Sequence, residues 1–179
     1  ADCILPKCCG CILGKMTRKN DESVTQSKVP QTGLKAEDLK PGDTASVDHY
    51  ICKTTGRLPH TAGREPNHKQ YTGGAVFCNH ASNLINVQHQ VLLIGSNTVR
   101  SKIKYERESQ KSGVQITNYH ANNGIFISKE FVTSLEDRSQ HIDYSSVGEH
   151  HQNGAAEGSI RIVTDRARTM MIHLSLIHI

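Results

Sequence analysis

The segment from Gly148 to Met171 constrains the fold most, because a polar, turn-like stretch runs there directly into apolar residues at helical spacing. The apolar residues return at intervals of four and three positions, which places them on one side of a helix. They are Ala156, Ile160, Val163, Ala167 and Met170. We therefore predict a helix that begins after the Asn153-Gly154 pair and lays this apolar stripe against a core.

Glu157 lies beside that stripe rather than on it. Together with Arg161, Thr164 and Arg168 it forms a neighbouring stripe, so a carboxylate near the helix start is followed by two cationic side chains. Two interpretations remain open from periodicity alone: an ordinary solvated face, or a face that a ligand reaches.

Upstream, apolar runs alternate with polar turns. The predicted strands are 45–51, 74–78, 87–94, 114–120 and 141–144. A helix over 96–111, capped by Ser96 or Asn97 and ended by Gly113, and a short helix over 128–138 complete the pattern. Three strands, a helix, a strand, a helix, a strand and a final helix predict an α/β or α+β domain with a mixed sheet.

Asp48 stands in the middle of the first predicted strand, ASVDHYI. A carboxylate buried within a strand requires a partner or a metal ion. A surface-facing position on an edge strand would also accommodate it, and both alternatives stay open.

The charge balance is mildly basic, with 21 Lys and Arg against 17 Asp and Glu among 179 residues, which permits nucleic acid as a partner without demanding it. Four cations, Arg100, Lys104, Arg107 and Lys111, recur at helical spacing and either bind nucleic acid or form a solvated surface. No apolar run approaches the roughly 20 residues that cross a bilayer, so we expect a soluble chain without a membrane partner.

Residues 1–19 contain the pair Cys8-x-x-Cys11, whose spacing lets two thiolates bind one zinc ion from a tight turn. The two further ligands are either missing from upstream or are Cys3 and Cys9, and the alternative is a set of incidental cysteines. Lys15, Arg18 and Lys19 make this module basic and are candidates for nucleic-acid contacts. Residues 20–42, which are polar and contain Pro30, Gly33 and Pro41, are predicted to be a linker to a main domain over 43–173.

The start of the chain suggests a fragment of a longer polypeptide, and its end suggests a processing scar. The chain starts at Ala1, inside the zinc-ligand pattern. Residues 174–179, LSLIHI, correspond codon for codon to CTGTCTCTTATACACATC, which resembles a transposase-based sequencing adapter. We therefore expect a processing scar there, with a natural apolar helix end as the alternative.

The order of four motifs resembles the integrase of copia-type retrotransposons. They are Cys8-x-x-Cys11-x-x-Gly14-Lys15, Asp48 in a strand, YHANNGIFISKEF and HHQNGAAEGSIR. The resemblance covers the chain from Cys8 to about His173. It implies a ribonuclease-H-like α/β fold, in which a mixed five-stranded sheet is flanked by helices. It also implies that residues 1–19 are the second half of a His-His-Cys-Cys zinc module.

The resemblance further implies a catalytic Asp, Asp, Glu triad at Asp48, Asn122 and Glu157, with 34 residues between the last two. In such a site two Mg²⁺ or Mn²⁺ ions are held by hard oxygen ligands and assist phosphodiester chemistry. Arg161 and Arg168 would then engage backbone phosphates. The implied partners are element DNA, target DNA and further copies of the chain, in the host nucleus and in cytoplasmic virus-like particles.

The chain departs from the family at the central position of the triad, where Asn122 replaces an Asp. A neutral amide in place of a bridging carboxylate should weaken metal binding sharply. Asn79 also stands where relatives usually have Asp, and Gly158 where they commonly have Arg. Three hypotheses follow: an integrase core impaired by Asn122, a catalytically inactive nucleic-acid-binding remnant, and a zinc-binding interaction module joined to an unrelated α/β domain.

Overall fold

The computed structural model describes residues 39–56, 66–145 and 153–174. The chain divides into two compact units, 34–159 and the combination of 1–33 with 160–179, and each is described by itself. The predicted zinc ligands Cys8 and Cys11, their candidate partners Cys3 and Cys9, and the basic residues Lys15, Arg18 and Lys19 lie outside the described residues. So do most of the predicted linker and residues 175–179.

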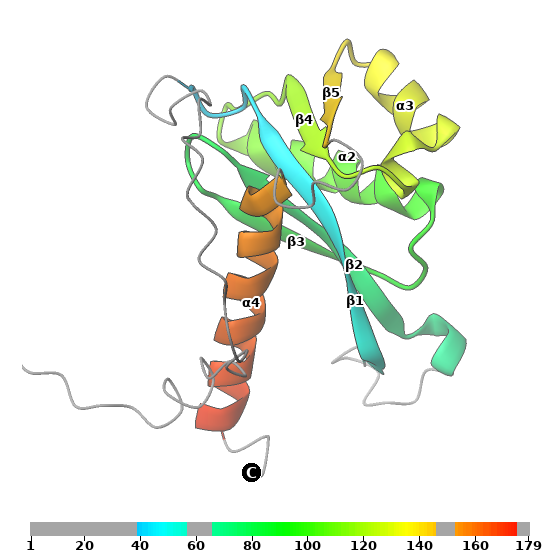
Figure 1. Cartoon of the computed structure of the whole chain (residues 1–179), viewed down its shortest axis with the longest axis vertical. Helices are drawn as coiled ribbons and strands as arrows, with labels where there is room; N and C mark the ends of the chain where they lie inside the picture. Colours follow the sequence, from blue (N-terminus) through cyan, green and yellow to red (C-terminus); the bar gives the residue numbers. More distant parts are fainter. Residues whose placement is uncertain (1–38, 57–65, 146–152, 175–179) are drawn as a thin grey trace, which may run out of the picture. The chain divides into compact units, whose positions relative to one another are not determined.

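A mixed five-stranded sheet forms the centre of the larger unit (Figure 1). Its strands are β1 (Ala45–Gly56), β2 (Tyr71–Asn79), β3 (Ile85–Gln90), β4 (Asn118–Ala121) and β5 (His141–Tyr144). Their order across the sheet is β3-β2-β1-β4-β5. The first three strands form an antiparallel meander, whereas β4 runs parallel to both β1 and β5. This arrangement confirms the mixed sheet and the ribonuclease-H-like fold class expected from the sequence.

In the described part of the chain, three α-helices and two short 3-10 helices accompany the sheet. They are η3 (Asn67–Lys69), α2 (Gly95–Lys111), η4 (Ile125–Ile127), α3 (Lys129–Glu136) and α4 (Gly154–His173). Within the described ranges, no helix has the length and apolar character needed to cross a membrane.

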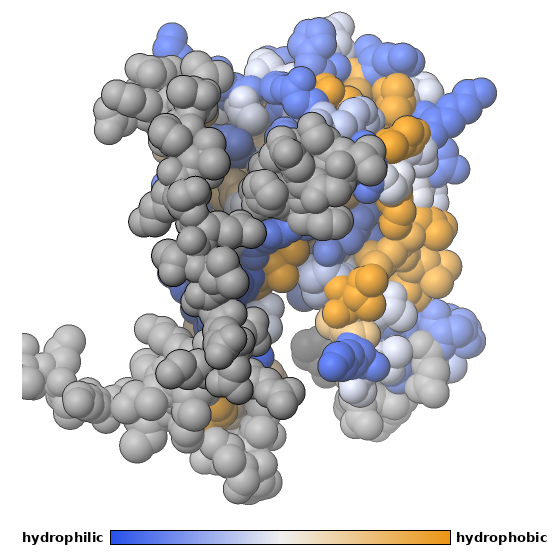
Figure 2. Space-filling view, viewed as in Figure 1, coloured by the Kyte–Doolittle hydropathy of each residue, from blue (hydrophilic) through white to orange (hydrophobic). Residues whose placement is uncertain are grey.

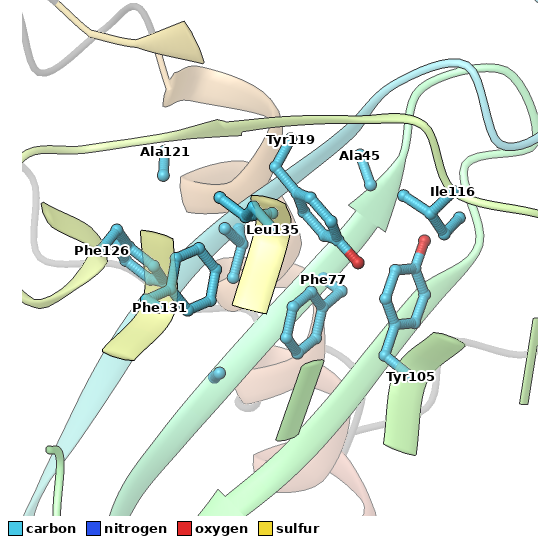
Figure 3. Packing of buried hydrophobic residues seen from close by; sticks show 11 residues of the cluster. Ala45, Phe77, Tyr105, Ile116, Tyr119, Ala121, Phe126, Phe131 and Leu135 are labelled. Carbon is cyan, nitrogen blue, oxygen red and sulfur yellow. The ribbon is translucent and has the colours of Figure 1, made fainter. Parts of the chain in front are cut away.

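The hydrophobic core lies on one side of the sheet, which we call the core face. Eleven buried residues make up the cluster, and they come from β1, β2, β4, η4, α2, α3 and the segment before β4: Ala45, Val47, Ala75, Phe77, Tyr105, Ile116, Tyr119, Ala121, Phe126, Phe131 and Leu135. Figure 3 shows the ring of Phe77 against that of Tyr105, with centroids 4.6 Å apart, while Phe126 and Phe131 lie together at the other end. Ring stacking of this kind adds to the folding free energy that comes from burying large apolar surfaces.

A buried polar network joins α2 to β4 and to the end of α3. The carboxylate of Glu106 accepts hydrogen bonds from Tyr119 (2.8 Å) and Gln140 (2.9 Å), and it pairs with Lys102 (2.9 Å) and Arg138. Burial alone would raise the pKa of Glu106, but these hydrogen bonds outweigh it and hold the pKa below its usual value. Glu106 therefore stays ionised inside the fold.

The predicted element ends differ from the observed ones where tertiary contacts decide them. The third strand was predicted to reach residue 94, but β3 ends at Gln90, whose side chain turns to Ser101 on α2. The predicted side-chain cap of α2 is wrong, because Ile94 is the N-cap and Asn97 donates instead to the carbonyl of Leu92 (2.9 Å). Gly113, with φ of +73°, follows the end of α2 as predicted.

The fourth strand is shorter than predicted because its first half is held by other contacts. The predicted strand 114–120 is observed only from Asn118. The backbone N–H of Thr117 donates to the carbonyl of Gly42, so this segment packs on the chain before β1.

The predicted apolar stripe of α4 is correct only at the start of the helix. Ala156 is fully buried, but Met170 is 63% exposed. The last buried side chain of α4 is that of Ser159, whereas Ile160 and Val163 are only partly buried. The prediction that the whole stripe lies against a core is therefore wrong for its outer part.

Replacing Glu106 with Ala should destabilise the fold by about 3–5 kcal/mol, because it leaves the fully buried Lys102 ammonium without its counter-charge. Denaturant unfolding would measure the loss. Glu108→Ala, an exposed change on the same helix, should cost less than about 1 kcal/mol.

The double variant Lys102→Met with Glu106→Leu should recover much of the stability, because it removes both charges together. Equal losses in Glu106→Ala and Glu108→Ala would contradict the role assigned to the network.

Candidate active site

The register of two parallel strands brings Asp48 and Asn122 together. β1 pairs with β4 so that Ala45 opposes Tyr119 and Val47 opposes Ala121. Val47 and Ala121 belong to the core cluster, and successive side chains in a strand point to opposite faces. The next residue after each is therefore on the other side of the sheet, which we call the site face. There the amide nitrogen of Asn122 lies 3.5 Å from Oδ2 of Asp48.

Asp48 is held on the central strand of the sheet, not on an edge strand. β1 has β2 on one side and β4 on the other, so the edge-strand alternative is wrong. The carboxylate is partly buried, and its Oδ1 accepts a hydrogen bond from the backbone N–H of His49 at 2.8 Å. Both carboxylate oxygens thus face a polar hydrogen.

His49 anchors this part of β1 from the core face. Its ring stacks on Phe126, with centroids 4.6 Å apart, and its Nε2 lies 3.1 Å from the hydroxyl of Thr98. Burial lowers the pKa of His49 to about 4, so the ring is neutral near pH 7. His49 is consequently a packing residue that fixes the backbone on which Asp48 stands.

Glu157 lies in the first turn of α4, in the same unit as Asp48 and Asn122. The start of this helix is fastened to β1 by Asn153, which is fully buried and donates from Nδ2 to the carbonyl of Val47 at 3.1 Å. Asn153 and Glu157 are four residues apart, the separation that puts two side chains on one helix face. Glu157 itself is exposed, so its carboxylate is open to solvent.

The donor set suits one hard cation better than two. Asp48 and Glu157 would contribute the two carboxylates of the predicted donor set, and Mg²⁺ is commonly held by one or two carboxylates with water and substrate phosphates completing its shell. Asn122 contributes at most a neutral carbonyl oxygen, whereas two adjacent dications need an anionic bridge. In the part of the chain that the structure describes, no group of three His, Cys, Asp or Glu side chains is placed to hold a metal ion. Magnesium binding here stays a prediction.

Comparison with known proteins bears on the fold. A chain of the simian T-cell lymphotropic virus intasome in complex with PP2A regulatory subunit B56 gamma matches 78% of this chain, with a TM-score of 0.61 and 13% identity. The HTLV-2 integrase catalytic core domain in complex with magnesium matches at 15% identity in its trimeric form (TM-score 0.54) and its dimeric form (TM-score 0.53).

The fold is that of a retroviral integrase catalytic core. The matched part amounts to 44% of the simian virus chain, against 78% of the HTLV-2 core in its trimeric form. No known protein family and no curated protein matches the chain by sequence.

Two predicted phosphate contacts lie on the outer part of α4. Arg161 is exposed, and Arg168 lies 3.7 Å from Asp165 in an ion pair on the helix surface. Both belong to the smaller unit, which comprises 1–33 and 160–179 and excludes the integrase-like core. Their role as phosphate contacts stays a prediction.

Asn79 and Gly158, the other two positions at which the sequence differs from the copia-type motifs it resembles, have different structural settings. Oδ1 of Asn79 accepts three hydrogen bonds from Ala81 and Ser82, so Asn79 closes the turn between β2 and β3. Gly158 has open space around the position of an added Cβ. Asn79 therefore has a structural role that the resemblance to copia-type motifs did not indicate.

Sequence reasoning also missed Asn153, which it assigned to a turn. An Asn-Gly pair is as typical of a simple turn as of an anchored helix start. Only the contact with Val47, 106 positions earlier in the chain, shows that Asn153 anchors the helix. No local signal could have identified it.

Replacing Asn153 with Ala should release the start of α4 from β1, because the buried carbonyl of Val47 loses its donor. We expect a loss of about 1–3 kcal/mol in stability. Hydrogen exchange of the amides over 154–159 should speed up as well. The matched control is Asn123→Ala, an exposed amide with a 3.5 Å contact to Ser145, which should leave both quantities nearly unchanged. Equal exchange over 154–159 in the two variants would refute the anchoring role.

Proposed function

We propose that residues 43–173 form the core of a copia-type retrotransposon integrase, a polynucleotidyl transferase that joins element DNA to target DNA and is weakened by Asn122. One observation carries the proposal: the parallel pairing of β1 and β4 puts Asp48 beside Asn122 on the site face of an integrase-like fold. The copia-type motifs support the finer assignment. An unrelated α/β domain gains no support from this fold.

The described residues could position a divalent ion and a phosphodiester. Asp48 and Glu157 would hold Mg²⁺ or Mn²⁺, which when bound activates an attacking 3′-hydroxyl and stabilises the leaving oxygen. The backbone N–H of His49 donates a hydrogen bond to the Asp48 carboxylate, which fixes the orientation of that carboxylate. Arg161 and Arg168 are proposed to bind backbone phosphates, which positions DNA without reading its sequence.

Asn122 weakens this arrangement in two ways. It removes one negative charge from the donor set, and its amide nitrogen is directed at the carboxylate of Asp48. A carboxylate at the same position would repel Asp48, and that repulsion would be relieved by a cation. Binding of a second metal ion should suffer most from the loss of this carboxylate, because the second ion must also overcome repulsion from the first.

The second candidate function is a nucleic-acid-binding remnant without catalytic activity. The contact between the Asn122 amide and Asp48 favours it, because the amide hydrogen partly satisfies the carboxylate that would otherwise recruit a metal. The two candidates differ only in residual turnover.

We further propose that the chain acts as a homo-oligomer. The HTLV-2 cores were solved in dimeric and trimeric forms. Several large apolar side chains on the surface of the larger unit are exposed to solvent, among them Ile51 at 78% and Leu92 at 55%. Among the coloured residues, Figure 2 shows hydrophobic surface gathered toward the right of the view, between hydrophilic residues.

The cofactor and location proposals rest on the family resemblance. Zn²⁺ would be bound by Cys8 and Cys11 once two further ligands are supplied. The proposed sites of action are the host nucleus and cytoplasmic virus-like particles.

The test is to restore the missing charge. Asn122→Asp should raise Mg²⁺- or Mn²⁺-dependent strand transfer by at least about 100-fold over the chain as it stands, the scale on which one electrostatic group affects an active site. It should also tighten Mn²⁺ binding in a calorimetric titration. Asn123→Asp adds the same charge one residue away, at an exposed position, and should change neither quantity.

Measurable metal-dependent transfer by the unmodified chain would exclude the inactive remnant. Strand transfer by the Asn122→Asp variant alone would favour the second candidate, an inactive remnant that descends from an active integrase. Absence of transfer and of tighter Mn²⁺ binding in a folded Asn122→Asp variant would refute the assigned site.

A further inference from the structure

The exposed side of α2 carries a straight row of positive charge. Arg100, Lys104, Arg107 and Lys111 are all exposed. At 100° per residue these four positions fall within about 60° of one another around the helix axis. The buried residues of α2 occupy the opposite side: Thr98, Ser101, Lys102, Tyr105, Glu106 and Ser109. We call the row of four cations the α2 stripe.

Among the residues that the structure describes, no carboxylate forms an ion pair with the α2 stripe. The helix contains two acidic residues, and both are used elsewhere. Glu106 is buried in the network with Lys102 and Tyr119. Glu108 stands four residues after Lys104 and three before Lys111, but its carboxylate accepts a hydrogen bond from Asn86 on β3 and forms no ion pair with either cation among the described residues. Over residues 39–56, 66–145 and 153–174, none of the four stripe cations forms an ion pair.

The α2 stripe and the candidate active site belong to opposite sides of the sheet. α2 packs on the core face, where Tyr105 stacks on Phe77. Asp48 and Asn122 project from the site face. Figure 1 shows α2 behind the strands, seen from the side on which β1 lies in front. A nucleic acid bound at Asp48 therefore does not run along the α2 stripe of the same protomer.

We propose that the α2 stripe binds the phosphate backbone of a second nucleic-acid segment, separate from the one at the candidate active site. This surface goes beyond the proposed function, in which the element DNA ends and the target DNA react at Asp48 and no contact with α2 is needed. Its partner is a duplex backbone, recognised by charge and spacing without base contacts.

The spacing of the α2 stripe suits a regular polyanion. From the first to the last cation the helix rises about 16 Å, in steps of about 6, 4.5 and 6 Å. One strand of a duplex presents a phosphate about every 3.4 Å along its axis, so a few phosphates lie within reach of the row. Long Lys and Arg side chains can adjust to that repeat, which gives binding independent of base sequence.

The experiment compares two variants of the full chain with equal net charge. The stripe variant carries Arg100→Gln, Lys104→Gln, Arg107→Gln and Lys111→Gln. The control carries Lys40→Gln, Lys53→Gln, Lys69→Gln and Arg166→Gln, all at exposed positions. Each variant loses four positive charges, which lowers the formal net charge at pH 7 from +4 to 0. Gln has a helix propensity close to those of Lys and Arg, so α2 should be preserved.

Fluorescence anisotropy would measure binding to a short labelled DNA duplex of arbitrary sequence across a salt series, with EDTA present. The stripe variant should bind roughly tenfold more weakly or worse at low salt, and its salt slope should fall by about three to four, one for each lost phosphate contact. The control should change the slope by less than about one. Circular dichroism would verify that both variants are folded.

Equal losses in both variants would overturn the proposal, since net charge would then explain the binding. Unchanged binding in the stripe variant would overturn it too. Stripe-dependent binding of polyglutamate as tight as that of the duplex would assign the surface to an acidic polypeptide instead. Because EDTA removes divalent ions, the anisotropy measurement does not depend on the metal site. A failure of stripe binding therefore says nothing about the Asn122→Asp strand-transfer assay, and a failure of that assay says nothing about stripe binding.

Discussion

The parallel pairing of β1 with β4 is the constraint on which the rest of this structure depends. It joins two strands that are about 70 positions apart in the chain, and three residue pairs define its register. A shift by one residue would send Asp48 or Asn122 into the hydrophobic core, where a polar group without a partner costs several kcal/mol. The core face enforces the register because Val47 and Ala121 are fully buried there.

The two faces of the sheet have separate tasks. The core face carries the aromatic packing and the Glu106 network, so the main hydrophobic cluster lies there. The site face carries Asp48 and Asn122, and the buried Asn153 brings the first turn of α4 to the same strand. A substitution at Asn122 can therefore change the chemistry of the site without disturbing the packing that forms it.

Much of the fold follows from local sequence patterns. β5 and the end of α2 at Gly113 agree with prediction, because strand alternation and a glycine with positive φ are local signals. The end of β3 was misjudged because Gln90 bonds to α2, a contact that periodicity does not report. For the site, motifs predicted Asp48 and Asn122, but the contact between Asn153 and Val47 depends on the folded chain.

Diffraction from manganese-soaked crystals of the Asn122→Asp variant tests the central claim most directly, because anomalous scattering locates the ion itself. We predict a manganese peak in contact with the carboxylates at positions 48 and 122, with Glu157 turned toward the same ion. A structure in which manganese binds elsewhere, or in which Glu157 lies on the core face, would contradict the account.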